Sequence, residues 1–126
     1  MPVILMVDDE PLIRRAVSDF LQDSGFDVLE ASNAAEAIKT ITSNDKAIDL
    51  VFSDVRMPGE LDGFGLSRWI RQNRPDLPVI LTSGYAKKAG AAQALQADEP
   101  FIPKPYNVQF VVGKIRATIE AKGKPA

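Results

Sequence analysis

Acidic side chains stand at the ends of short apolar runs in this chain of 126 residues. Asp8 and Asp9 follow the first run, Asp54 ends a later one, and Thr82 and Lys104 stand at the ends of two more. A carboxylate in such a place can cap a turn or a helix. It can also bind a metal ion or attack an electrophile, so the side chains that lie near it in space decide its role.

Carboxylates that lie close together repel one another unless a cation lies among them. Oxygen ligands favour a hard cation, and Mg²⁺ is the expected ion. A carboxylate beside this ion can attack phosphorus and form an acyl phosphate, while a hydroxyl and an ammonium group stabilise the transferred phosphoryl group. The residue types are therefore suited to a phosphoryl-accepting site, in which Asp54 is expected to be exposed at the lip of a sheet.

The composition excludes several other kinds of site. The chain has no cysteine and no histidine, which excludes disulfides, thiol nucleophiles and histidine-ligated metals within the chain. Its net charge is −2, without a basic block, so direct contact with nucleic acid is not expected. No apolar run approaches the roughly 20 residues of a membrane span, and the N-terminus lacks the pattern of a signal peptide. We expect a cytoplasmic protein without membrane contact.

Five apolar runs alternate with segments of helical periodicity. The expected strands are Val3–Val7, Phe26–Glu30, Ile48–Ser53, Pro78–Ser83 and Pro100–Lys104. The expected helices are Pro11–Ser24, Asn33–Ile41, Phe64–Asn73, Ala86–Gln96 and Tyr106–Ala121. This alternation predicts a doubly wound α/β fold, with helices on both faces of a parallel sheet.

The expected architecture is a five-stranded parallel sheet in the order 2-1-3-4-5, a flavodoxin-like (βα)5 fold. The pattern alone also fits neighbouring strand orders. We expect one domain over residues 1–122 and a flexible tail over residues 123–126. Since ligands bind such sheets at the carboxyl ends of the strands where the order reverses, the acids after strands one and three should meet there.

Four motifs at the strand ends resemble the receiver domain of two-component response regulators. They are VDDE after strand one, DVRMPGELDG around the end of strand three, LTSG at the end of strand four, and Lys104-Pro105. The resemblance covers essentially the whole chain. Gly63 lies nine positions after Asp54, one more than the spacing expected of the family. The chain also lacks the family's Gly-Ala pair before strand five.

The resemblance implies a role for each residue of the metal and phosphoryl site. Asp54 would be the phosphoacceptor, taking its phosphoryl group from a phosphohistidine of a histidine kinase or histidine phosphotransfer protein. Asp8, Asp9 and Asp54, with the backbone carbonyl of Arg56, would bind Mg²⁺. Lys104 would pair with a phosphoryl oxygen.

Thr82 and Phe101 would form the switch that follows phosphorylation. Thr82 would bond the phosphoryl group, and the rotamer of Phe101 would follow it. The change would bias the face formed by the fourth helix, strand five and the fifth helix toward an unidentified protein partner, or the phosphate would pass onward in a phosphorelay. The chain can be a single-domain regulator or a receiver segment of a longer protein.

Each of these residues also has a simpler interpretation. Taken alone, Asp8 and Asp9 are helix-capping residues, Asp54 and Gly63 are turn residues, and Thr82 is a strand end. Their joint occurrence at several strand ends favours the receiver. The alternatives are a receiver that binds partners without phosphorylation, a small Mg²⁺-dependent phosphohydrolase and a flavin-binding module. We expect a protein that catalyses only its own phosphorylation and dephosphorylation.

Overall fold

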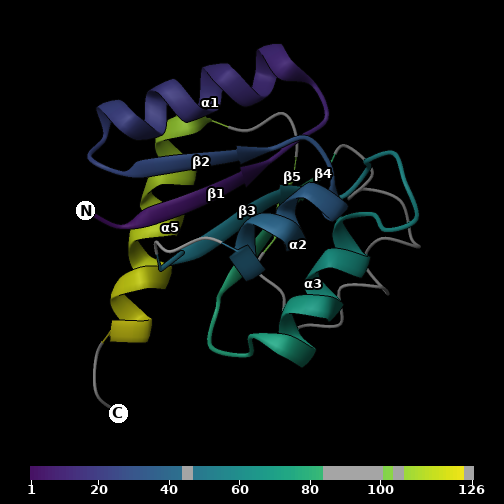
Figure 1. The fold of residues 1–126 in the computed structure, drawn as a ribbon. Coiled ribbons are helices and arrows are strands. Elements are labelled where there is room, and N and C mark those ends of the chain that lie inside the picture. The colour runs from purple at the N-terminus through teal and green to yellow at the C-terminus, as the bar shows by residue number, and fades with distance from the viewer. Residues whose placement is uncertain (44–46, 84–100, 104–106, 124–126) are drawn as a thin grey trace.

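The computed structural model describes residues 1–43, 47–83, 101–103 and 107–123 (Figure 1). Its strands are β1 (Val3–Val7), β2 (Asp27–Ala31), β3 (Leu50–Asp54), β4 (Val79–Ser83) and β5 (Phe101–Pro103). Its helices are α1 (Pro11–Asp23), α2 (Ala34–Ser43), α3 (Gly63–Asn73) and α5 (Val108–Gly123). The predicted helix over Ala86–Gln96 lies outside the described residues.

The strands form one parallel sheet in the order β2-β1-β3-β4-β5. The predicted flavodoxin-like arrangement, a parallel sheet flanked by helices, is confirmed. The chain reverses direction across the sheet after β2, so β1 and β3 are neighbours although a strand and two helices separate them in sequence. Pro103 stands in the edge strand β5, where its missing N–H interrupts no inner ladder.

Both faces of the sheet are buried, which explains the continuous apolar runs. Along β1, Val3, Leu5 and Val7 pack in one cluster with residues of α2 and α3. Ile4 and Met6 point to the other face and pack with residues of α1 and α5. Side chains alternate between the two faces along a strand. Helices α2 and α3 therefore cover one face of the sheet, and α1 and α5 cover the other (Figure 1).

Local signals set the ends of α1. Pro11 occupies the start of the helix, where its missing N–H costs nothing. Gly25 follows the last turn with a φ of 98° and donates its N–H to the carbonyl of Gln22 at 3.1 Å. Phe26, predicted to open β2, instead donates its N–H to the carbonyl of Leu21, so the strand begins one residue later.

The N-terminus of α2 is closed by reciprocal hydrogen bonds. The Asn33 side chain accepts the N–H of Glu36 at 2.8 Å, and Glu36 Oε1 accepts the N–H and the hydroxyl of Ser32, each at 2.8 Å. The hydrogen bond from the Ser32 backbone N–H, and then the one from the Ser32 hydroxyl, hold the pKa of Glu36 below its ordinary value. The arrangement fixes the helix start beside the carboxyl end of β2.

Several ends differ from the sequence-based expectation, and among them α3 begins at Gly63 instead of Phe64. β3 includes Asp54, because Asp54 continues the pairing with Thr82 of β4. α5 extends to Gly123, two residues beyond the expected end. Within the described ranges, no helix combines the length and apolar character that a membrane crossing requires.

Two glycines provide a test of how backbone conformation contributes to stability. Gly113 is exposed in α5, and a Cβ placed there, as at Gly25, would meet no heavy atom within 4 Å. We expect Gly113→Ala to raise the free energy of unfolding by about 0.5–1 kcal/mol. Gly25→Ala should lower it by about 1 kcal/mol because of the positive φ. Urea denaturation measures both, and equal effects of the two substitutions would contradict this assignment.

Candidate functional site

The sheet brings three carboxylates together at the carboxyl ends of β1 and β3. Val7 pairs with Ser53 across these strands, so the residues that follow them are neighbours. One carboxylate oxygen from each of Asp8, Asp9 and Asp54 lies within 4.8 Å of the other two. Asp8 is fully buried and Asp9 is exposed. The predicted convergence of these side chains is therefore present in the structure.

Asp54 is buried rather than exposed as the sequence suggested. Only 5% of its surface is accessible, because it ends a central strand and lies beside Asp8 and the loop that follows β3. Asp9 is the exposed member of the cluster.

Asp8 both shapes the turn before α1 and belongs to the cluster. Its Oδ1 accepts the N–H of Glu10 at 2.9 Å, which is a turn hydrogen bond and not the helix cap of the simpler interpretation, since α1 has no side-chain cap hydrogen bond. Arg14 donates to the Asp8 carbonyl oxygen at 2.8 Å and pairs with Glu30 of β2 at 2.9 Å. Arg14 of α1 thus links the end of β1 to β2 next to the carboxylate cluster.

Sequence reasoning missed this role of Arg14. The available signal was a basic residue in the first turns of the helix after β1, with an acid at the end of the adjacent strand, Glu30. That signal is weak, since basic and acidic residues are common on helix surfaces. Only the strand order makes the pairing specific.

Hydrogen bonds on several sides hold the backbone around Asp54. The Ser53 hydroxyl donates to the Asp54 carbonyl oxygen at 2.9 Å. The Val55 N–H donates to the Thr82 carbonyl oxygen at 3.0 Å, and the Val55 carbonyl oxygen accepts the N–H of Gly63 at 2.7 Å. β4 and the start of α3 therefore fix the chain where it leaves β3.

Thr82 lies opposite Asp54 in the register of β3 and β4. It is fully buried, and its hydroxyl oxygen has no hydrogen-bond partner among the described residues. Such an orphaned hydroxyl is uncommon in a folded protein and calls for an explanation. A group added to Asp54 would be a neighbour that could supply the missing bond.

The remaining predicted site residues are described only in part or not at all. Arg56 is exposed in the loop after β3, two residues beyond Asp54. Phe101 opens β5 and pairs with Leu81, but its side chain lies outside the described part. Lys104 also lies outside the described residues. The roles predicted for all three stay predictions.

The carboxylate cluster fits a hard divalent cation. All three side chains offer oxygen atoms, and Asp8 is held in place by its turn hydrogen bond. Mg²⁺ prefers one or two carboxylates with water completing its shell, and the exposure of Asp9 leaves room for water. A cation here would offset the mutual repulsion of the carboxylates.

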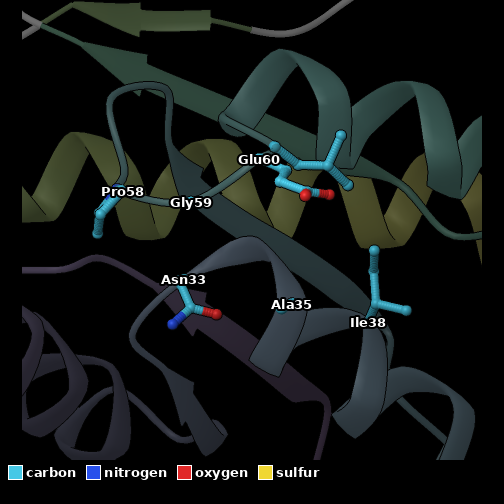
Figure 2. A pocket seen from close by; sticks show the side chains of 7 residues that line it. Asn33, Ala35, Ile38, Pro58, Gly59 and Glu60 are labelled. Atoms are coloured by element: carbon cyan, nitrogen blue, oxygen red, sulfur yellow. The ribbon is translucent and has the colours of Figure 1, made fainter.

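A separate hollow lies next to the loop after β3. Its volume is about 620 Å³, and Figure 2 shows it between the start of α2 and the segment that carries Pro58, Gly59 and Glu60. Ala35, Ile38 and Leu61 give it a largely apolar lining. Gly59 has a φ of 106°, which this turn requires.

Neutralising one carboxylate tests the cation site. We expect Mg²⁺ to stabilise the wild-type protein by about 2.7 kcal/mol at a concentration of about 100 times Kd. Asp9→Asn should raise the thermal midpoint of the metal-free protein, because repulsion falls, and should remove most of the Mg²⁺-dependent rise. Scanning calorimetry with and without Mg²⁺ measures both effects. Asp19→Asn on the exposed side of α1 is the control, and equal Mg²⁺ shifts in the two variants would refute the assignment.

The orphaned hydroxyl of Thr82 makes a second prediction. Thr82→Val keeps the shape and removes the buried polar atom, so the unmodified protein should become more stable by about 1 kcal/mol. Urea denaturation measures this change. Thr42→Val is the matched control, because the Thr42 hydroxyl is exposed and already bonds the Ile38 carbonyl oxygen. A loss of stability in Thr82→Val comparable with other buried polar deletions would show that the hydroxyl has a partner.

Comparison with known proteins places the chain in a family. Residues 4–116 match the response regulator receiver domain. The sensor kinase CckA of Brucella abortus is 36% identical over 93% of the chain, which spans 12% of that protein. A response regulator receiver domain from Clostridium thermocellum superposes with a TM-score of 0.87 at 30% identity, covering 97% of each chain.

A further solved structure carries a metal complex. It is the response regulator TrrA from Thermotoga maritima in complex with Mg(2+)-BeF, at a TM-score of 0.78 and 34% identity, covering 93% of this chain and 98% of that one. With the parallel sheet and the acidic cluster at its carboxyl edge, these likenesses identify the family. The chain belongs to the response regulator receiver domains, the signalling switches of two-component systems.

Proposed function

We propose that this chain accepts a phosphoryl group on Asp54, with Mg²⁺, from a phosphohistidine of a histidine kinase or histidine phosphotransfer protein. The observation that carries the proposal is the approach of Asp8, Asp9 and Asp54 oxygens to within 4.8 Å. Three carboxylates at this separation are costly for stability alone, and a site for a cation and a phosphoryl group explains them.

The metal would be bound by Asp8, Asp9 and Asp54, together with the backbone carbonyl of Arg56. When bound, Mg²⁺ neutralises charge on the carboxylates and on the phosphoryl oxygens, which lowers the barrier to phosphoryl transfer. The complex of TrrA with Mg(2+)-BeF supports a magnesium site of this kind in the family.

The protein's own contribution is the position of the nucleophile. A carboxylate oxygen of Asp54 attacks phosphorus, a new P–O bond forms, and the P–N bond to the partner's imidazole breaks. The buried strand end and the hydrogen bonds around Val55 hold Asp54 in one place, so little ordering is needed at reaction. Lys104 would stabilise a phosphoryl oxygen.

The signal would travel through Thr82 and Phe101. Phosphorylation adds charge and hydrogen-bond acceptors opposite the orphaned Thr82 hydroxyl, which favours a state in which the two bond. Phe101 is the proposed second member of the switch.

The output and the extent of the domain remain part of this proposal. We infer a protein contact or onward transfer of phosphate, in the cytoplasm, by a domain that covers residues 1–122. The activity is limited to the domain's own phosphorylation and dephosphorylation. The main alternative is a receiver that binds its partner without phosphorylation, and the experiment below separates the two.

Phosphoryl acceptance is tested by intact-protein mass after incubation with phosphoramidate and Mg²⁺. We expect one added phosphoryl group that hydroxylamine removes, since an acyl phosphate reacts with this nucleophile. Asp54→Ala should show no adduct. Asp19→Ala, which changes an exposed acid of α1, should be modified like the wild type.

Two outcomes would contradict the proposal. An adduct that persists in Asp54→Ala would place the modified residue elsewhere. No adduct in a folded wild-type protein, with Mg²⁺ binding shown separately and with samples quenched within seconds, would favour the phosphorylation-independent receiver.

A further inference from the structure

The first turn of α3 lies directly against the peptide group that follows Asp54. A Cβ built on Gly63 would overlap the Asp54 carbonyl oxygen and would lie 2.6 Å from the Val55 Cα. Real Cβ contacts essentially never fall below 3.0 Å. Both neighbours are backbone atoms, so no side-chain rotation can relieve the contact.

Backbone conformation does not explain why position 63 is a glycine. Among the described residues, the glycines with positive φ are Gly25 and Gly59, and Gly63 is not one of them. Any residue could therefore adopt the dihedral angles of Gly63. What position 63 requires is the absence of a side chain on the face toward Asp54.

Neither side of this contact can move without breaking other interactions. On one side, Asp62 caps α3 by accepting the N–H of Gly65 at 2.9 Å, and Leu66 is fully buried in the core. On the other, Val55 donates to the Thr82 carbonyl oxygen at 3.0 Å. The Gly63 N–H also binds the Val55 carbonyl oxygen at 2.7 Å. The start of α3 and the end of β3 form one rigid unit.

We propose that Gly63 is a positioning residue for the phosphoryl-accepting site: its bare Cα lets α3 fix the Asp54–Val55 peptide, and with it the distance from Asp54 to the other carboxylates. The inference rests on the proposed function of Asp54. A side chain at position 63 would displace this peptide. The displacement would move Asp54, the proposed nucleophile, and the carbonyl of Arg56, which follows Val55 in the chain.

Gly63→Ala is the test, and Gly65→Ala is its matched control. Gly65 lies in the same helical turn and is also buried, but a Cβ there would meet the side chain of Leu61, with Cδ2 at 2.8 Å. The end of a leucine side chain can rotate away. Both variants add one methyl group to α3, and only one of them presses on the backbone of the site.

The readouts are the Kd for Mg²⁺ and the phosphorylation rate with phosphoramidate, measured well below the thermal midpoint of each variant. We expect Gly63→Ala to lower the rate at saturating Mg²⁺ by about 10- to 100-fold, the scale of a misplacement near 1 Å, and to weaken Mg²⁺ binding. Gly65→Ala should keep both values near wild type. A purely structural role would lower the midpoint and leave both values of the folded protein unchanged, which would overturn the inference.

Two further outcomes are decided by the same design. If the wild type accepts no phosphoryl group, the proposed function fails, and the Kd for Mg²⁺ in Gly63→Ala still supports or overturns the positioning role. If Gly63→Ala does not fold, Asp62→Ala replaces it, because loss of the cap frees the start of α3. For Asp62→Ala we then expect the Kd for Mg²⁺ to rise by about 3-fold or more, a change no larger than the loss of one cap hydrogen bond can cause. An unchanged Kd would contradict the inference.

Discussion

The repulsion among three carboxylates is the constraint around which this domain is organised. Asp8, Asp9 and Asp54 each offer an oxygen within 4.8 Å of the others, a separation at which ionised carboxylates repel one another. The parallel register of β1 and β3 imposes the approach, since Val7 and Ser53 are paired. The sheet is buried on both faces, and this apolar burial offsets the repulsion among the three carboxylates.

The elements around the acids act as supports for that arrangement. Arg14 binds the Asp8 carbonyl and Glu30, which fixes the β1 end from the side of α1. The start of α3 fixes the β3 end through Gly63. Hydrogen bonds therefore fix both strand ends, while the buried hydroxyl of Thr82 has no hydrogen-bond partner within the described part of the chain. A domain built this way can convert a single modification into a structural change.

The parallel fold could be predicted from short-range signals: continuous apolar runs, helical periodicity and polar strand ends. The meeting of the acids also required the strand order that makes β1 and β3 neighbours, which these signals alone left open. It placed Asp54 at an exposed lip, whereas the structure buries it. Exposure depends on what covers a residue, and the loop geometry after β3 is not encoded in periodicity. The packing of Gly63 on Asp54 was hidden for the same reason, since a turn glycine and a contact glycine look alike in sequence.

We propose that Asp54 and its neighbours form one metal-assisted phosphoryl site. The most direct measurement is a crystal structure of the wild-type protein grown with Mg²⁺ and beryllium fluoride, which mimics a phosphoryl group. We expect beryllium fluoride on the Asp54 carboxylate, Mg²⁺ on oxygens of Asp8, Asp9 and Asp54, and the Thr82 hydroxyl bonded to a fluorine atom. Beryllium fluoride bound elsewhere, or a metal that avoids the three carboxylates, would contradict it.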